Sequence, residues 1–243
     1  MDDRTSFLAS CEACGLNALC IPNSLTEQEI AIVDEVIERP KPIAFNKLVW
    51  NQGDKFTSIY VVRAGAVKLF SVDEDGDEYV IGFYLPGEIL SMGALHSEHH
   101  ENSAIALETT YVCEIEFGRL EELSSQIHNL QSYMYRKLSS EIQEDQRHQL
   151  LIGKRTARQR VASFLLDISL RYQRRRLSPT SFRLPMSRTD IASYLALSAE
   201  TISRVIGGLR KDDIVSFDGK NVEILDLHQL CEAAHRAEQV QQE

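Results

Sequence analysis

Residues 119–152 contain neither glycine nor proline, and their apolar side chains recur at helical spacing. An uninterrupted stretch of this kind predicts a long helix, because no residue in it breaks the backbone hydrogen-bond pattern. The sequence before this stretch differs from the sequence after it: β-like runs precede the stretch, and a basic, helix-rich pattern follows it. The 243 residues are enough for two modest domains, each with its own core, so we predict a two-domain α+β protein.

The part before the long helix reads as a single β domain. Short runs rich in β-branched and aromatic residues alternate there with glycine and aspartate, which predicts a barrel, sandwich or roll. The runs are residues 58–62, 66–70, 79–84 and 111–115. The whole chain then divides into a cysteine-bearing stretch (1–24), a β domain (25–118), the long helix (119–152) and a basic C-terminal domain (153–243).

The β domain opens with a short helix, which Ser24 or Thr26 can cap. Acidic residues follow immediately, as the helix dipole favours. Its apolar positions recur at helical spacing and are Ile30, Val33, Val36 and Ile37.

One row of side chains along the long helix follows a heptad, with separations of 3, 4, 3 and 4 residues. This row consists of Tyr135, Leu138, Ile142, Asp145 and Gln149, and Ile152 extends it. We predict that it is the seam of a homodimer. Packing against the chain's own β domain is the alternative, and it suits Ile127, Leu130 and Met134 best.

Asp145 stands at a seam position, where it would meet its counterpart in the dimer. Two facing carboxylates repel each other. Our hypothesis is that Asp145 keeps the dimer marginal, so that a small conformational change can make or break it.

The charge of the chain is unevenly distributed. The net charge is -10, but residues 153–211 hold 13 Lys and Arg against three acidic residues, Asp167, Asp190 and Glu200. This stretch therefore carries +10 and the remainder -20. A compact basic region is what phosphate binding requires, so we expect nucleic acid to bind there despite the acidic total.

Two short helices joined by a tight turn lie inside the basic stretch. Ser187 and Asp190 form a capping-box pattern for the first, and Ser198 caps the second, residues 199–210. Helix, turn and helix is the arrangement that places the second helix in the major groove of DNA. Its apolar face is Ile202, Val205, Ile206 and Leu209.

The opposite face of the second helix presents Glu200, Ser203 and Arg204. Arginine matches guanine O6 and N7, glutamate accepts from the cytosine amino group, and serine serves either base type. Arg188 and Ser198, at the starts of the two helices, complete the predicted DNA-contacting set. Residues 215–217 and 222–224 flank an Asp-Gly turn and predict a two-stranded wing, with Lys220 at its tip.

Four of the five cysteines, Cys11, Cys14, Cys20 and Cys113, can form one site. The first residues lack a signal-peptide pattern and no run is long enough for a membrane span, so we expect a cytoplasmic protein with reduced thiols. Reduced thiols favour a metal or redox site over disulfides. Spacing alone leaves an iron–sulfur cluster and a zinc ion both open. Cys231 has no neighbouring thiol in the sequence.

The order of parts resembles the superfamily of the cyclic AMP receptor protein, and within it the FNR branch, the fumarate and nitrate reduction regulators. Nearly the whole chain takes part in this resemblance. The motifs that carry it are Cys11-x2-Cys14-x5-Cys20-Ile21-Pro22, Ala106-Leu107-Glu108-Thr109 before Val112-Cys113-Glu114-Ile115, and Glu200-Thr201-Ile202-Ser203-Arg204.

The resemblance implies a cyclic-nucleotide-binding-like β-roll, a long dimerisation helix and a C-terminal winged helix-turn-helix. It implies that the four cysteines ligate a [4Fe–4S] cluster, which oxygen converts to [2Fe–2S] and then destroys, so that the dimer falls apart. It also implies a palindromic site of the form TTGAT-N4-ATCAA, read by Glu200, Ser203 and Arg204. An activator touches RNA polymerase as well, and the exposed turn Asp73–Glu78 is the surface we expect to do so.

One departure separates the chain from nucleotide-binding relatives. Where they place an Arg-Ser pair on the cyclic phosphate, this chain has Asn102-Ser103, so we expect no cyclic nucleotide ligand. Two other readings stay open: the same fold under zinc or thiol-redox control, and a cyclic-nucleotide-binding module. No P-loop, nucleophile elbow or HExxH motif is present, so we expect no enzyme.

Overall fold

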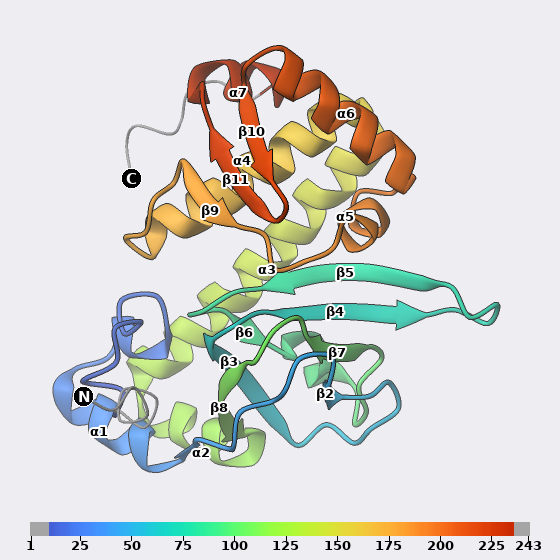
Figure 1. The fold of residues 1–243 in the computed structure, drawn as a ribbon. Helices are drawn as coiled ribbons and strands as arrows, with labels where there is room; N and C mark the ends of the chain where they lie inside the picture. The colour runs from blue at the N-terminus through green and yellow to red at the C-terminus, as the bar shows by residue number, and fades with distance from the viewer. Residues whose placement is uncertain (1–9, 236–243) are drawn as a thin grey trace. The chain divides into compact units, whose positions relative to one another are not determined.

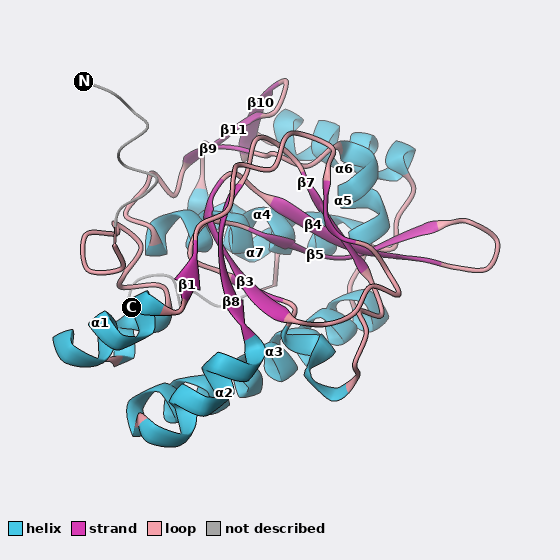
Figure 2. Ribbon diagram, turned by 90° about the horizontal axis from the view of Figure 1, so that it is seen from below, coloured by secondary structure: helices cyan, strands magenta, loops and turns pink. Residues whose placement is uncertain are grey.

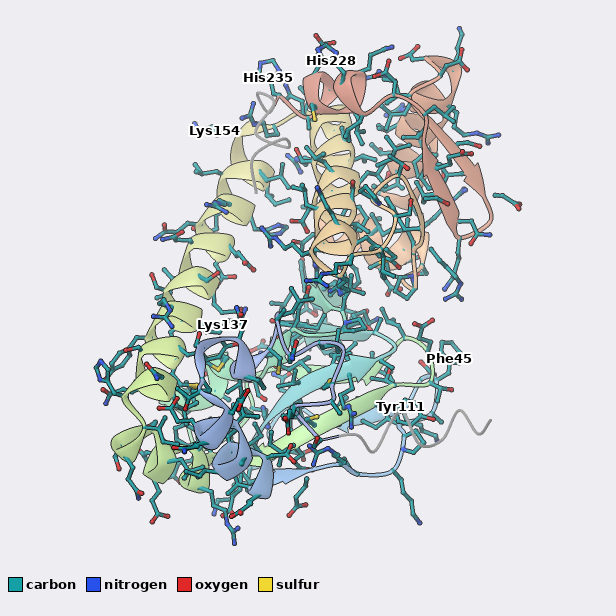
Figure 3. All side chains as sticks on the ribbon, turned by 90° about the vertical axis from the view of Figure 1, so that its left-hand side faces the viewer. Phe45, Tyr111, Lys137, Lys154, His228 and His235 are labelled. Carbon is teal, nitrogen blue, oxygen red and sulfur yellow. The ribbon has the colours of Figure 1, made fainter. Side chains whose placement is uncertain are left out.

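The computed structural model describes residues 10–235. These form two compact units, one ending at Gln143 and the other beginning at Glu144. Helix α3 (His128–Lys154) runs through the boundary and so belongs to both. Lys137 and Lys154, labelled in Figure 3, both lie on this helix. No helix of the described residues is both long and apolar enough to span a membrane.

The first unit is the expected β-roll, built from two four-stranded antiparallel sheets (Figures 1 and 2). One sheet has the order β1-β8-β3-β6, with strands Ile37–Glu38, Tyr111–Glu116, Ser58–Ala64 and Ile89–Leu90. The other has the order β2-β7-β4-β5, with strands Leu48–Trp50, Ser103–Ala106, Val67–Val72 and Glu78–Tyr84. All four runs predicted as strands are strands, in β3, β4, β5 and β8. The four shorter strands, β1, β2, β6 and β7, were not predicted.

Helices pack against the first sheet to close a core. Ile59 and Ile115 of the sheet are completely buried with Leu130 of α3, and Leu120 of helix α2 (Phe117–Gln126) is nearly so. Ile127, Leu130 and Met134 all belong to this core, as the intramolecular alternative expected. The N-terminal part of the long helical stretch therefore packs against the roll of its own chain.

The expected single helix over 119–152 is in fact two. Helix α2 ends at Gln126, Ile127 takes an extended conformation, and α3 begins at His128. Neither glycine nor proline marks this break; it coincides with the burial of Ile127 in the core of the roll. Packing has overridden local helix propensity, which is a weak preference for any single residue.

Helix α1 (Glu27–Glu35) is shorter than the apolar spacing predicted. Thr26 is its N-cap, and its side chain forms a capping box with Glu29. Val36 ends the helix, and Ile37 pairs with Ile115 as the first residue of β1, so its assignment to the helix was wrong. A strand partner more than seventy residues away decided its conformation.

The second unit contains the helix-turn-helix and its wing. Its elements are α4 (Ala157–Arg174), β9 (Ser181–Arg183), α5 (Arg188–Tyr194), α6 (Ala199–Lys211), β10 (Val215–Asp218), β11 (Asn221–Ile224) and α7 (Leu227–Ala233). The predicted helix pair and hairpin are both present. The wing gains a third strand, β9, which pairs with β11, and α7 packs on α4. Neither β9 nor α7 was expected from the sequence.

Candidate cysteine pocket and DNA-reading helix

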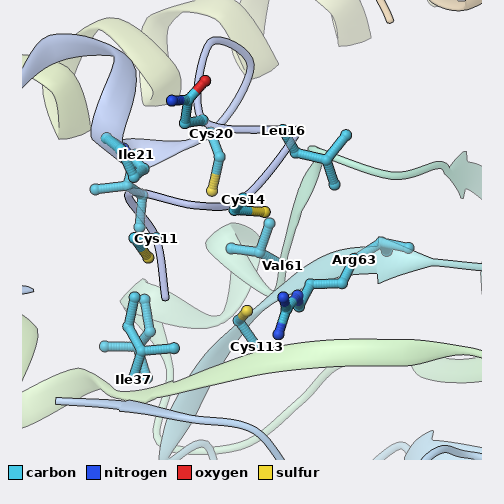
Figure 4. A pocket seen from close by; sticks show the side chains of 13 residues that line it. Cys11, Cys14, Leu16, Cys20, Ile21, Ile37, Val61, Arg63 and Cys113 are labelled. Carbon is cyan, nitrogen blue, oxygen red and sulfur yellow. The ribbon is translucent and has the colours of Figure 1, made fainter. Parts of the chain in front are cut away.

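The four cysteines singled out from the sequence line one pocket (Figure 4). Cys11, Cys14 and Cys20 come from a series of tight turns ahead of α1, and Cys113 comes from strand β8. The remaining walls are mostly apolar and include Ile21, Ile37, Val61 and Ile115. Cys231 lies in α7 of the other unit and is buried there. All five cysteines are free thiols.

Backbone hydrogen bonds shape the cysteine turns. The Cys14 amide donates to the Cys11 carbonyl at 3.3 Å, and the Cys20 amide donates to the Leu16 carbonyl at 3.1 Å. Leu19 then rests on Gly87, where a β-carbon would stand 3.0 Å from that of Leu19. Gly87 has φ +90°, which a residue with a side chain rarely adopts. The turn at Gly87 therefore gives the cysteine loop room to lie directly on the roll.

The neighbours of Cys11 and Cys113 hold them in place. The Cys11 amide donates to Asp34 Oδ1 at 2.9 Å, which ties the turn to helix α1. Cys113 pairs with Val61 in the β3–β8 ladder, so its position follows from the sheet register. Two segments about a hundred residues apart are thus fixed on opposite sides of one pocket.

The pocket favours neutral thiols when nothing positive occupies it. Burial raises the pKa of Cys20 to about 12, and it also raises the pKa of Cys113. Burial, then the hydrogen bond and charge of Asp34, raise the pKa of Cys11 further. Thiolates form in such surroundings when a metal centre supplies compensating positive charge.

The chemistry of the donor set bears on the kind of metal centre. Four thiolates are the usual ligands of a [4Fe–4S] cluster, and they also bind zinc. The four thiols and mostly apolar walls of this pocket therefore fit an iron–sulfur cluster without excluding a zinc ion.

Helix α3 contacts the segment that carries Cys20. Asn129 donates to Glu29 at 3.0 Å, and Arg136 donates to Ser24 at 3.2 Å. Tyr133 lies between them on the same face, and its burial, followed by the charge that a Cys20 thiolate would carry, raises its pKa. No sequence pattern predicted these contacts between α3 and the segment after Cys20.

The predicted seam residues differ in exposure. Tyr135 and Ile142 are 64% and 58% exposed, and Asp145 and Gln149 are also exposed. Leu138 is partly buried and packs against the core of the roll. Leu150 is 64% exposed on the same helix, so the apolar surface available to a second copy includes a residue outside the predicted row.

The second helix of the motif, α6, presents the predicted contact residues. Glu200, Ser203 and Arg204 are exposed, while Ile202 and Leu209 on the other face are fully buried. The Ser198 hydroxyl accepts the Thr201 amide at 3.1 Å and so caps the helix. The same Ser198 hydroxyl donates to the Thr201 hydroxyl at 2.9 Å.

Arg188, the first residue of α5, is exposed as well. The capping box predicted ahead of it is present: the Asp190 amide donates to the Ser187 hydroxyl at 3.0 Å. The start of α5 is therefore firmly defined beside the candidate contact residue.

Not every arginine of the basic stretch is available to phosphate. Arg160 of α4 donates to the carbonyls of Leu195 at 3.0 Å and Ala196 at 3.3 Å, in the turn between α5 and α6. Arg158 forms an ion pair with Asp212 at 2.7 Å. These two residues hold the motif together, which charge counting could not distinguish from DNA contact.

Lys220 has an internal role as well. The sequence placed it at the tip of the wing, and its ammonium donates to the Pro185 carbonyl at 2.6 Å. The Asp-Gly turn beside it is formed as expected, with Gly219 at φ +59°.

The residues that would face a cyclic phosphate are engaged within the roll. The Asn102 carbonyl accepts the Trp50 indole N–H at 2.9 Å, and the Ser103 hydroxyl accepts the Gln52 amide at 2.9 Å. The Trp50 ring also stacks on His100, with centroids 4.5 Å apart. The charged donor that a phosphodiester needs is absent from this pair of residues.

The turn Asp73–Glu78 joins β4 to β5 and is exposed (Figure 1). The Asp73 carboxylate accepts the amides of Asp75 at 3.0 Å and Asp77 at 2.9 Å, which orders the turn. Glu78 forms an ion pair with Lys68 at 2.6 Å. An ordered acidic loop is thus presented at one end of the hairpin.

Comparison with known proteins agrees with this architecture. The cyclic nucleotide-binding domain family matches residues 41–126, and the Crp-like helix-turn-helix domain family matches residues 159–233. The chain is 43% identical to the transcriptional activator protein Anr of Pseudomonas protegens, over 95% of both chains. It is 41% identical to the fumarate and nitrate reduction regulatory protein of Escherichia coli, over 92% of this chain and 90% of that one.

Solved structures give the same picture. The structure of FixK2 from Bradyrhizobium japonicum is similar with a TM-score of 0.76 and 27% identity, covering 83% of this chain and 99% of that one. With the roll, the helix-turn-helix and relatives this similar over almost the whole length, the chain belongs to the FNR branch of the Crp/FNR family and is a transcription regulator with a Crp-like DNA-binding domain.

Proposed function

We propose that the protein is an oxygen-responsive regulator, mainly an activator of genes used without oxygen, controlled by a [4Fe–4S] cluster on Cys11, Cys14, Cys20 and Cys113. The observation that carries the proposal is that these four thiols line one apolar pocket, although Cys113 lies on a strand far away in sequence. When bound, the cluster supplies an iron–sulfur centre that oxygen can attack.

The chain's own residues would translate the state of the pocket into the state of the dimer helix. Cys20 precedes the buried Ile21, and the segment from Ser24 to Glu29 is joined to α3 through Arg136 and Asn129. A change in how Cys20 is held therefore acts directly on one face of α3. Its exposed apolar residues, among them Tyr135 and Ile142, would contact a second copy.

In the dimer, two copies of α6 would read the two halves of a palindrome of the TTGAT-N4-ATCAA type. Arg204 and Glu200 would read base edges by direct hydrogen bonds, with Ser203 beside them. Arg188 would contact the DNA backbone at the start of α5. The turn Asp73–Glu78 is the surface we assign to RNA polymerase, and the site of action is the cytoplasm.

The test begins with protein purified without oxygen. We expect a brown protein with about four iron and four sulfide per chain, as the proposed cluster requires. It should bind a fluorescent palindromic duplex as a dimer. On exposure to air, colour, dimer content and DNA affinity should fall together.

Single cysteine replacements provide the matched control. Cys14→Ser should abolish the colour and weaken DNA binding at least tenfold, because one ligand is lost. Cys231→Ser should behave like the unmodified protein, because Cys231 lies in α7 of the other unit. A colourless protein with one zinc per chain would refute the iron–sulfur proposal and favour zinc control. Unchanged DNA binding in both variants would refute control by the pocket altogether.

A further inference from the structure

The cysteine pocket contains one strongly cationic side chain. Among the described residues that line it, Arg63 of β3 is the only one with a permanent charge. Figure 4 shows its guanidinium beside Cys113, facing the space between the thiols. The positive charge of Arg63 opposes the rise in pKa that burial causes at Cys113.

A second arginine stands behind Cys11. The Arg39 side chain is only 17% exposed, and one of its terminal nitrogens lies 4.0 Å from Cys11 Sγ. The same nitrogen is paired with Asp34, and the other donates to the Ile37 carbonyl at 3.2 Å. Among the described residues, the Arg39 Nε is buried without a hydrogen-bond partner, which is costly. Arg39 thus brings a buried positive charge next to Cys11.

Both cations are placed where negative charge would accumulate. Four thiolates carry more negative charge than the iron–sulfide core offsets, and the apolar walls give little solvent screening. Net charge and hydrogen bonds to the sulfurs are among the factors that set the potential of such a centre. Arginine suits this task, because its guanidinium stays charged when buried and offers several N–H donors.

We infer that Arg63, beside Cys113, and Arg39, beside Cys11, are positioning residues for the iron–sulfur ligands. Their positive charges stabilise the negative charge of the thiolate set and so raise the cluster's reduction potential. This inference rests on the proposed function. It identifies two residues outside the cysteine motif that determine how readily the centre gives up electrons.

The test uses the full chain, purified without oxygen, as Arg63→Gln, Arg39→Gln and the corresponding lysine variants. Midpoint potential is measured by redox titration of the visible and paramagnetic resonance spectra. Each glutamine variant should shift the one-electron equilibrium at least tenfold toward the oxidised form, about 59 mV lower in potential. Each lysine variant should recover at least half of this shift, because the charge is restored.

Arg119→Gln is the matched control, since Arg119 lies on α2, is 63% exposed and does not line the pocket. It should leave the potential unchanged. If both glutamine variants stay within twofold of the unmodified protein, the inference is refuted. If a glutamine variant retains no cluster, the lysine variant at the same position is measured instead. A cluster retained by the lysine variant at near-normal potential supports a role for the charge. Loss of the cluster from the lysine variant as well refutes that role. Absence of iron and sulfide from the unmodified protein would instead refute the proposed function itself.

Discussion

Replacing Arg160 with glutamine should loosen the turn between the two helices of the DNA-binding motif. Arg160 reaches from α4 to the carbonyls of Leu195 and Ala196, in the turn that follows α5, where Ala196 has a left-handed φ of +50°. Its Nε also donates to the Arg155 carbonyl at 3.0 Å. A cation at a helix C-terminus is favoured by the dipole as well as by these hydrogen bonds.

The magnitude follows from what each carbonyl loses. Hydrogen bonds that involve a charged group contribute about 1.5–3 kcal/mol each when the partner is shielded from water. The Leu195 side chain is fully buried in the motif, whereas Ala196 is exposed, so its carbonyl can bind water instead. We therefore count about one full interaction and part of a second, a loss of about 2–3 kcal/mol. For a unit of this size that corresponds to a fall of about 10–20 °C in Tm.

Two signals separate the units in one unfolding experiment. The single tryptophan, Trp50, lies in the roll, so its fluorescence follows the first unit. Far-UV circular dichroism also follows α4 to α7 in the second. Arg160→Gln should lower the midpoint temperature at which the second unit unfolds, as seen by circular dichroism. It should leave the midpoint of the tryptophan-fluorescence transition unchanged. DNA affinity should fall with it, because the orientation of α6 depends on the turn.

Arg174→Met is the control, because Arg174 is exposed on the same helix and its replacement removes one positive charge as well. If Arg160→Gln destabilises the second unit by less than about 0.5 kcal/mol, or no more than Arg174→Met does, the clamp contributes nothing beyond surface charge. The reasoning would then be refuted.

Asp145→Ala should shift the monomer–dimer equilibrium toward dimer in protein stripped of metal, measured by sedimentation; an unchanged equilibrium contradicts a repulsive role. His148 stacks on Tyr194 at 4.3 Å and burial lowers its pKa, opposed in part by Asp145. The unfolded chain then takes up the proton first as pH falls below about 6.5, so the second unit should lose stability between pH 7 and 5. His148→Phe should flatten this dependence, and an equally steep loss would exclude His148 as its source. Ser187→Ala removes the capping box with Asp190 and should cost about 1 kcal/mol in thermal unfolding, while a loss below about 0.3 kcal/mol would mean that water replaces the cap.

Local pattern was sufficient wherever a residue's role depends on its neighbours in sequence. The Ser187 capping box, the Ser198 cap and the division of α6 into buried and exposed faces are consequences of helical spacing, and all are present in the structure. The longer strands of the roll, β3, β4, β5 and β8, could be located in the same way, because alternation and turn residues are local signals.

Long-range contacts were beyond such reasoning. Ile37 has a residue pattern typical of a helix, but its pairing with Ile115 makes it a strand. Ile127 interrupts the long helix without glycine or proline, where its side chain enters the core. Both outcomes depend on partners that are distant in sequence or on the shape of a core, for which a sequence window carries no signal.

The same division applies to the candidate site. The sequence alone predicted that four thiols share one site and that one face of α6 reads DNA, because ligand type and helical period depend on residue identity and spacing. The three-dimensional fold was needed to bring the four thiols around one mostly apolar pocket, and to place Arg63 in its wall and Arg39 beside Cys11. It also decided that Arg160 supports the motif and that Leu138 belongs to the roll. The physical reason is that charge and burial act through space, and a side chain's neighbours in space are set by the fold.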